Sequence, residues 1–182
     1  MKPANSGSPQ PGSLSGGVLL DSNFIVAFVN DGDRWHESAA LMLASLVRLR
    51  QAEGLRLATS TRVLDEVWWK RTQLKVEAEQ GRGSWNRLTR SARRTALVSA
   101  RGLLEGLHAD LQRCGVEILG VPPESVDLAL GFVVREVGGL EPADAFHAAV
   151  MRLNGITSIV TNDRDFARVD DVQVIRYDPS SR

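Results

Sequence analysis

Short apolar runs alternate along this chain with longer segments in which apolar residues recur every three or four positions. The short runs predict buried strands at residues 18–20, 55–59, 116–119, 156–160 and 172–176. The longer segments predict helices at residues 24–29, 37–53, 90–113, 122–137 and 142–154, with a further helix capped by Ser60 or Thr61. Gly54 and Gly155 are placed to end two of these helices.

This alternation of strands and helices predicts the α/β class, with one domain built on a central, mostly parallel sheet flanked by helices. A chain of 182 residues with 43% hydrophobic content can bury one sizeable core but hardly two. Residues 1–17 are rich in Gly, Pro and Ser, which predicts a disordered tail. The domain is therefore expected over residues 18–178.

Charge and cysteine usage exclude several classes of protein. The 22 basic residues balance the 22 acidic ones, so no overall positive field marks a nucleic-acid binder. Cys114 is the single cysteine, which excludes an intramolecular disulfide and a cysteine-based metal cage. No apolar stretch is long enough for a membrane span, and the first residues do not resemble an export signal. We expect a cytoplasmic protein with no membrane partner.

Four acidic residues stand where strands should end or helices should begin. Asp21 and Asp163 follow two predicted strands, Asp144 lies in the first turn of a helix, and Glu66 lies within two turns of the second strand. Connections in a parallel sheet bring such positions to one rim, where ligands bind. Carboxylates gathered on one rim favour a hard divalent cation such as Mg²⁺ or Mn²⁺.

Each acid also has an ordinary structural explanation. Asp21 is a common turn former, Asp144 an ordinary first-turn acid, and Asp163 with Asp165 belongs to a polar loop. Glu66 has Arg62 at four-residue spacing and could be a solvated helix charge. Only the combination of the four acids favours a metal site.

Four segments together resemble the PIN-domain ribonuclease family and, within it, the VapC-like toxins. They are Leu-Leu-Asp-Ser-Asn at 19–23, Val-Leu-Asp-Glu-Val at 63–67, Pro-Ala-Asp-Ala-Phe-His-Ala-Ala at 142–149 and Thr-Asn-Asp-Arg-Asp-Phe at 161–166. Their order and spacing match from about residue 18 to residue 176. The segments at 31–55 and 81–101 are longer than in a compact toxin.

The resemblance implies a Mg²⁺- or Mn²⁺-dependent endoribonuclease, in which a metal-activated water hydrolyses RNA phosphodiesters. It also implies that the protein is the toxin of a toxin–antitoxin pair, with an antitoxin protein as its partner. Asp21, Glu66 and Asp144 match the family's main metal-binding and catalytic acids, and Asp163 matches the fourth. The resemblance places supporting residues at Asn23, Thr161 and Asp165.

An arginine-rich stretch between residues 81 and 104 contains no acid. Its arginines could contact RNA phosphates, which would make RNA binding salt-dependent, or they could form a solvated helix face. Both interpretations stay open, and Trp85 could add base stacking. The candidate RNA-binding residues are Arg82, Arg87, Arg90, Arg93 and Arg94.

The remaining ring side chains allow two interpretations each. His147 could orient Asp144 from one turn away, although packing on a helix face is favoured. Trp35, Trp68 and Trp69 are expected as core or interface anchors. Any tryptophan face left exposed would favour a homodimer or a docked antitoxin.

The competing functional hypotheses are a housekeeping RNA-processing nuclease and a PIN-fold RNA- or protein-binding module without catalysis. Aspartyl phosphotransfer of the haloacid-dehalogenase kind would require a second aspartate where Asn23 stands. A dinucleotide-binding module would require a Gly-x-Gly-x-x-Gly motif after the first strand, which the sequence lacks.

Overall fold

Five short parallel strands form one sheet in the computed structural model, which describes residue 14, residues 16–134 and residues 140–178. The strand order is β3-β2-β1-β4-β5, and each neighbouring pair is parallel. The predicted α/β class with a parallel central sheet is therefore confirmed. The strands are β1 (Val18–Leu20), β2 (Leu57–Ser60), β3 (Glu117–Leu119), β4 (Ser158–Val160) and β5 (Gln173–Ile175).

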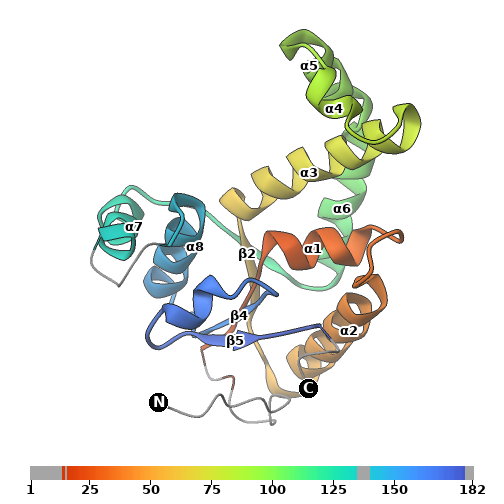
Figure 1. Cartoon of the computed structure of the whole chain (residues 1–182). Helices are drawn as coiled ribbons and strands as arrows, with labels where there is room; N and C mark the ends of the chain where they lie inside the picture. Colours follow the sequence, from red (N-terminus) through yellow and green to blue (C-terminus); the bar gives the residue numbers. More distant parts are fainter. Residues whose placement is uncertain (1–13, 15, 135–139, 179–182) are drawn as a thin grey trace.

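Helices cover both faces of the sheet, as Figure 1 shows. Strand side chains alternate between the faces: Val18 and Leu20 join one core cluster, and Leu19 joins another. The first cluster packs under α1 (Ser22–Val29), α2 (His36–Glu53), α3 (Thr61–Gln80) and α6 (Arg101–Arg113). The second packs under α8 (Pro142–Leu153) and the 3₁₀ helix η1 (Asp165–Arg168), and α7 (Ser125–Val134) lies against α8.

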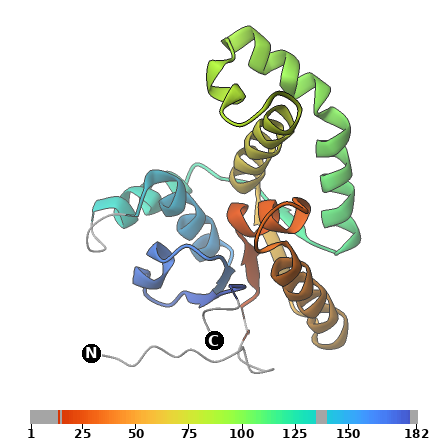
Figure 2. The ribbon, with the colours of Figure 1, turned by 45° about the vertical axis from the view of Figure 1, so that its right-hand side comes forward.

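An arm of helices projects away from the sheet beyond the end of α3, and it is clearest in Figure 2. It consists of the last turns of α3 with α4 (Ser84–Arg87) and α5 (Arg90–Ser99). The prediction of one helix over residues 90–113 is wrong, because the chain bends at Ala100. The Ser99 hydroxyl donates to the Ala96 carbonyl at 2.8 Å, and Ala100 is fully buried at the bend.

Local sequence signals set several of the observed boundaries. The Ser60 hydroxyl accepts a hydrogen bond from the Val63 backbone N–H at 3.1 Å, so the predicted cap of α3 is confirmed. Gly54 ends α2 in the left-handed conformation, with φ of 72°. Helix α7 begins at Ser125, later than predicted, because backbone turns at Pro122 and Pro123 precede it.

Some predicted features lie outside the described residues. These are most of the tail, namely residues 1–13 and 15, and the last residues, 135–137, of the helix predicted over residues 122–137. Across the described part of the chain, no helix is both long and apolar enough to cross a membrane.

Candidate active site

Asp21 occupies the junction between the central strand β1 and helix α1. Its backbone is extended and its side chain caps α1, because Oδ1 accepts the Ser22 backbone N–H at 2.6 Å. Oδ2 accepts the Thr161 hydroxyl at 2.7 Å from the end of the adjacent strand β4. The carboxyl group is almost fully buried, at 3% exposure. Burial raises the pKa of Asp21, although His147, Thr161 and Ser22 oppose that rise.

The Thr161 hydroxyl is the centre of a hydrogen-bond network that joins the ends of β1 and β4. It accepts from Asn23 Nδ2 at 2.8 Å and from the Asp163 backbone N–H at 2.9 Å. A hydroxyl has two acceptor sites and one proton, so the Thr161 proton is left for Asp21. The structure therefore places two of the three predicted supporting residues, Thr161 and Asn23, in direct contact with each other and next to Asp21.

Asp163 lies in the loop after β4, Asp165 is the first residue of η1, and the two carboxylates have different partners. Asp163 Oδ1 accepts the Asp165 backbone N–H at 2.9 Å, which fixes the loop. The Asp165 carboxylate instead pairs with Arg168 at 3.3 Å. Arg176 also holds this loop by donating to the Asn162 carbonyl at 2.9 Å. Asp163 thus stays close to the other acids, whereas Asp165 is engaged on η1.

Glu66 lies in the second turn of α3 and points toward α8. Its Oε2 atom is 3.5 Å from His147 Nε2, and its Oε1 atom is 3.3 Å from Arg62 Nε. Burial alone would raise the pKa of Glu66, but His147 outweighs it, with help from Ser22 and Arg62, so the pKa is lowered. The negative charge on Glu66 is therefore compensated by neighbouring side chains.

His147 is buried between Glu66 and the 3₁₀ helix. It is 1% exposed, and its ring stacks on Phe166 with the centroids 6.5 Å apart. Its Nδ1 atom finds no hydrogen-bond partner in the described part of the chain. The interpretation of His147 as a packed helix residue fits this burial, and its polar contact is with Glu66 rather than with Asp144.

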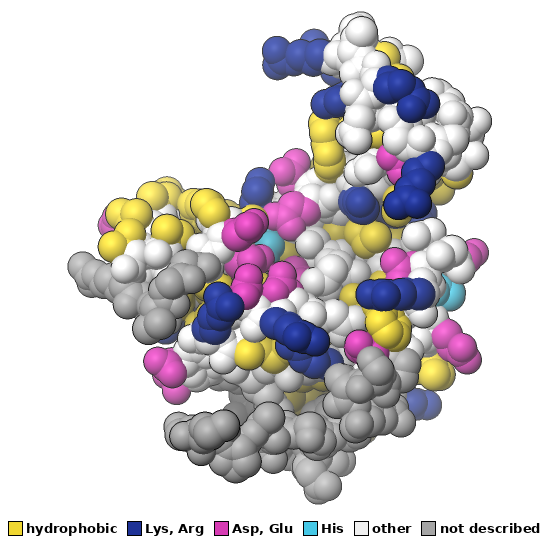
Figure 3. Space-filling view, in the orientation of Figure 1, with side chains coloured by type: hydrophobic (Ala, Val, Ile, Leu, Met, Phe, Trp, Pro, Cys, Tyr) yellow, Lys and Arg dark blue, Asp and Glu magenta, His cyan; other side chains and the backbone are white. Residues whose placement is uncertain are grey.

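Asp144 is the least compensated of the four acids. It is half-buried in the first turn of α8, and its pKa is raised to about 6. Burial is the largest cause, and the charge of Asp163 is the second; Asp21 and Glu66 add to the rise, and His147 opposes it. The other three predicted acids therefore all act on Asp144 at one rim, and Figure 3 shows acidic side chains gathered on this face.

The candidate RNA-binding arginines lie on the arm, apart from the acidic rim. Arg82, Arg87, Arg90 and Arg94 are exposed. The half-buried Arg93 lies over the rings of Trp85 and Trp69, at 5.3 and 6.0 Å. Trp85 is only 3% exposed, so the expectation that it stacks on a base is wrong. Trp69 follows Glu66 by three residues, so α5 folds back against the first half of α3, the half that also carries Glu66.

Sequence reasoning missed two residues that shape this site, Tyr177 and Arg176. It did note the four-residue spacing of Arg62 and Glu66, and the two side chains form an ion pair in the structure. Tyr177 donates to Asn23 Oδ1 at 3.1 Å, and Arg176 holds the Asp163 loop. Both come from the segment that follows β5, and no local pattern links that segment to Asp21.

The fold is similar to several solved structures. VapC20 of Mycobacterium tuberculosis, described as a sarcin-ricin loop cleaving toxin, is 24% identical with a TM-score of 0.52 over 83% of this chain and 93% of its own. VapBC2 of Rickettsia felis, bound to a promoter DNA fragment, is 16% identical with a TM-score of 0.53, covering 87% and 97%. FitAcB of Neisseria gonorrhoeae is 17% identical with a TM-score of 0.54, covering 88% and 97%.

A sequence comparison with curated proteins gives no match. The family model of the PIN domain, in contrast, matches residues 18–172. That range spans β1 to the loop before β5 and includes all four acids of the rim. The chain belongs to the PIN-domain family.

Proposed function

We propose that this protein is a Mg²⁺- or Mn²⁺-dependent endoribonuclease whose cation is held by Asp21, Glu66, Asp144 and Asp163. The observation that carries the proposal is the gathering of four carboxylates at one rim, where Thr161 joins Asp21 to the Asp163 backbone and Glu66 faces α8 through His147. The raised pKa of Asp144 agrees with it, because burial and three neighbouring acids disfavour its negative charge. A divalent cation would remove that repulsion, and oxygen ligands are those that Mg²⁺ and Mn²⁺ prefer.

The donor set fits such a cation. Glu66 Oε1 is buried and accepts no hydrogen bond from the described residues, although Arg62 Nε is its ion-pair partner at 3.3 Å, so a lone pair remains for a cation. Among the described residues, no three His, Cys, Asp or Glu side chains already form a metal cage. Binding of the cation would therefore draw the carboxylates of the rim closer together.

The neighbouring side chains have positioning roles in this proposal. Thr161 and Asn23 hold Asp21 at the end of β1, and His147 with Arg62 holds Glu66. The bound cation would lower the pKa of an attacking water and screen charge on the phosphate. A serine, cysteine or histidine nucleophile is not required, and the leaving group is a ribose oxygen of the cleaved RNA.

We further propose that the protein is the cytoplasmic toxin of a toxin–antitoxin pair and forms a homodimer. Support comes from the fold shared with VapC20, a toxin, and with VapBC2. Trp68 and Trp69 on α3 are 41% and 44% exposed, as expected for residues that anchor a partner. Helix α7 exposes further apolar side chains, namely Val126, Leu130 and Val134.

The purified chain is expected to cleave a mixed pool of structured and single-stranded RNAs with Mg²⁺ or Mn²⁺, and a chelator should abolish the cleavage. Asp21→Asn and Asp144→Asn should each lower the rate roughly 100-fold or more, because each removes a charged ligand. Asp127→Asn, an exposed acid on α7, is the matched control and should leave the rate unchanged. No cleavage by the folded wild type with either metal would favour the non-catalytic binding module.

Asp144→Asn should also stabilise the metal-free protein at pH 7.5, by on the order of 1 kcal/mol after allowance for solvent screening. A raised pKa means that the folded state binds the proton more tightly, so the ionised carboxylate costs stability above pH 6. The gain should shrink as the pH falls from 6 toward 4. Thermal melting measures it, and Mn²⁺ should raise the melting temperature of the wild type more than that of the variant. Equal melting temperatures at pH 7.5 would contradict the repulsion at the rim.

Arg90→Ala combined with Arg94→Ala should weaken RNA binding and flatten its salt dependence if the arm contacts phosphates. Each lost contact lowers the slope of log K against log salt by about 0.7 on a single strand. Arg48→Ala, an exposed arginine on α2, is the control and should change neither quantity. An unchanged slope in the double variant would show that the arm is only a solvated surface.

The partner proposals make a prediction about mass and complex formation. Sedimentation equilibrium of the purified chain should give about twice its mass of 19.9 kDa. Co-expression with the product of the adjacent reading frame should yield a stable complex that no longer cleaves RNA. A monomer at every concentration would overturn the homodimer, and an active nuclease without a binding neighbour would favour a housekeeping enzyme.

A further inference from the structure

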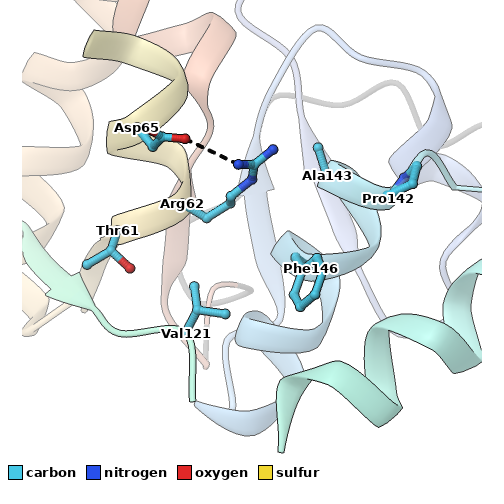
Figure 4. Close-up of a pocket in the computed structure, with 7 residues that line it drawn as sticks. All are labelled: Thr61, Arg62, Asp65, Val121, Pro142, Ala143 and Phe146. Atoms are coloured by element: carbon cyan, nitrogen blue, oxygen red, sulfur yellow. Dashed lines mark hydrogen bonds and ion pairs between the residues drawn. The ribbon is translucent and has the colours of Figure 1, made fainter. Parts of the chain in front are cut away.

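A cavity of about 530 Å³ lies between the first turn of α3 and the first turn of α8, as Figure 4 shows. Its walls are mostly apolar, formed by the ring of Phe146 with Val121, Pro142 and Ala143. Thr61, Arg62 and Asp65 supply polar groups on the α3 side. This size and this mixture of an apolar wall with a few polar groups are typical of small-ligand sites.

The helix geometry places this cavity directly beside the acidic rim. Pro142, Ala143 and Phe146 share one face of α8, because residues three and four apart are neighbours on a helix. Asp144 and His147 form the adjacent face, which turns to the acids. On α3, Asp65 lines the cavity and Glu66, the next residue, belongs to the rim.

Arg62 connects the two places. Its Nη1 atom is 3.2 Å from Asp65 Oδ2 at the cavity, and its Nε atom is 3.3 Å from Glu66 Oε1 at the rim. A guanidinium has five N–H donors, so these two contacts leave others for a ligand. Figure 4 shows the guanidinium between Asp65 and Ala143, over the opening between the helices. It places a positive charge at the edge of an otherwise acidic centre.

We infer that this cavity binds one unpaired nucleobase of the RNA substrate, next to the phosphodiester that is cleaved. The inference rests on the proposed nuclease function. An aromatic wall offers a stacking partner for any base, and single-stranded RNA is commonly recognised through such stacking. Arg62 would contact the phosphate that joins the bound nucleotide to the acidic rim.

The polar groups of the cavity favour some bases over others. The Asp65 carboxylate is an acceptor without a proton to donate, and its side chain is 73% exposed despite the contact with Arg62. It can accept from the exocyclic amine of adenine, cytosine or guanine, whereas uracil offers only its N3–H, which is flanked by two carbonyl oxygens that a carboxylate repels. The cavity should therefore prefer an amine-bearing base to uracil.

Binding of short RNAs to the Asp21→Asn protein, with a chelator present, tests this inference without cleavage. An RNA with 2-aminopurine at the bound position should lose fluorescence on binding, because the probe stacks on Phe146. Replacement of that base by an abasic site should weaken binding roughly 10- to 100-fold. Phe146→Leu keeps most of the side-chain volume but removes the ring, so it should lose both effects while the protein stays folded.

Two further variants separate the alternatives. Leu153→Ala, which shortens a 43% exposed side chain at the far end of α8, should behave as the parent protein. Asp65→Asn should reduce the preference for cytosine over uracil, because an amide can donate as well as accept. Equal quenching and equal abasic penalties in Phe146→Leu and its parent would overturn the base pocket. If the wild type cleaves nothing while base-dependent binding persists, the nuclease proposal fails and the pocket stands.

Discussion

The site depends on how a buried carboxylate is kept at the end of the central strand. Removing Asp21 from water is costly, and the fold compensates with one hydrogen bond to each oxygen, from Ser22 and from Thr161. Thr161 can serve because Asn23 and the Asp163 backbone already occupy its acceptor sites. A single hydroxyl thus couples the carboxyl ends of β1 and β4 and sets where the Asp163 loop begins.

The acids around Asp21 fall into two electrostatic groups. Glu66 is compensated by His147 and Arg62, which lower its pKa, whereas Asp144 has mostly like charges near it, and its pKa is raised to about 6. A cation at the rim would be stabilised most by the charge of Asp144. The Glu66 side chain would already be oriented by its contact with His147 on α8. The two helices would therefore differ in what they contribute to a cation site: α3 would supply a positioned ligand, and α8 the carboxylate with the unbalanced charge.

The fold could be predicted because the sequence signals that specify strands, helix caps and helix ends act locally. Buried runs, the Ser60 cap and Gly54 each act over a few residues, and parallel connections then bring strand ends to one rim. The bend at Ala100 and the burial of Trp85 depend on how the arm packs against α3, which periodicity does not report. The contact between Glu66 and His147 likewise depends on the distance between two helices that are far apart in sequence.

The positions of the cavity and the arm imply different roles in recognition. The cavity shares its helices with Glu66 and Asp144, so a base bound there would fix which phosphodiester reaches the rim. The exposed arginines of the arm lie outside this cavity, where they could contact phosphates of another part of the substrate. Contacts to phosphate carry no sequence information, whereas a pocket beside the reacting bond does. Specificity would then reside in the few side chains between α3 and α8, and affinity in the arm.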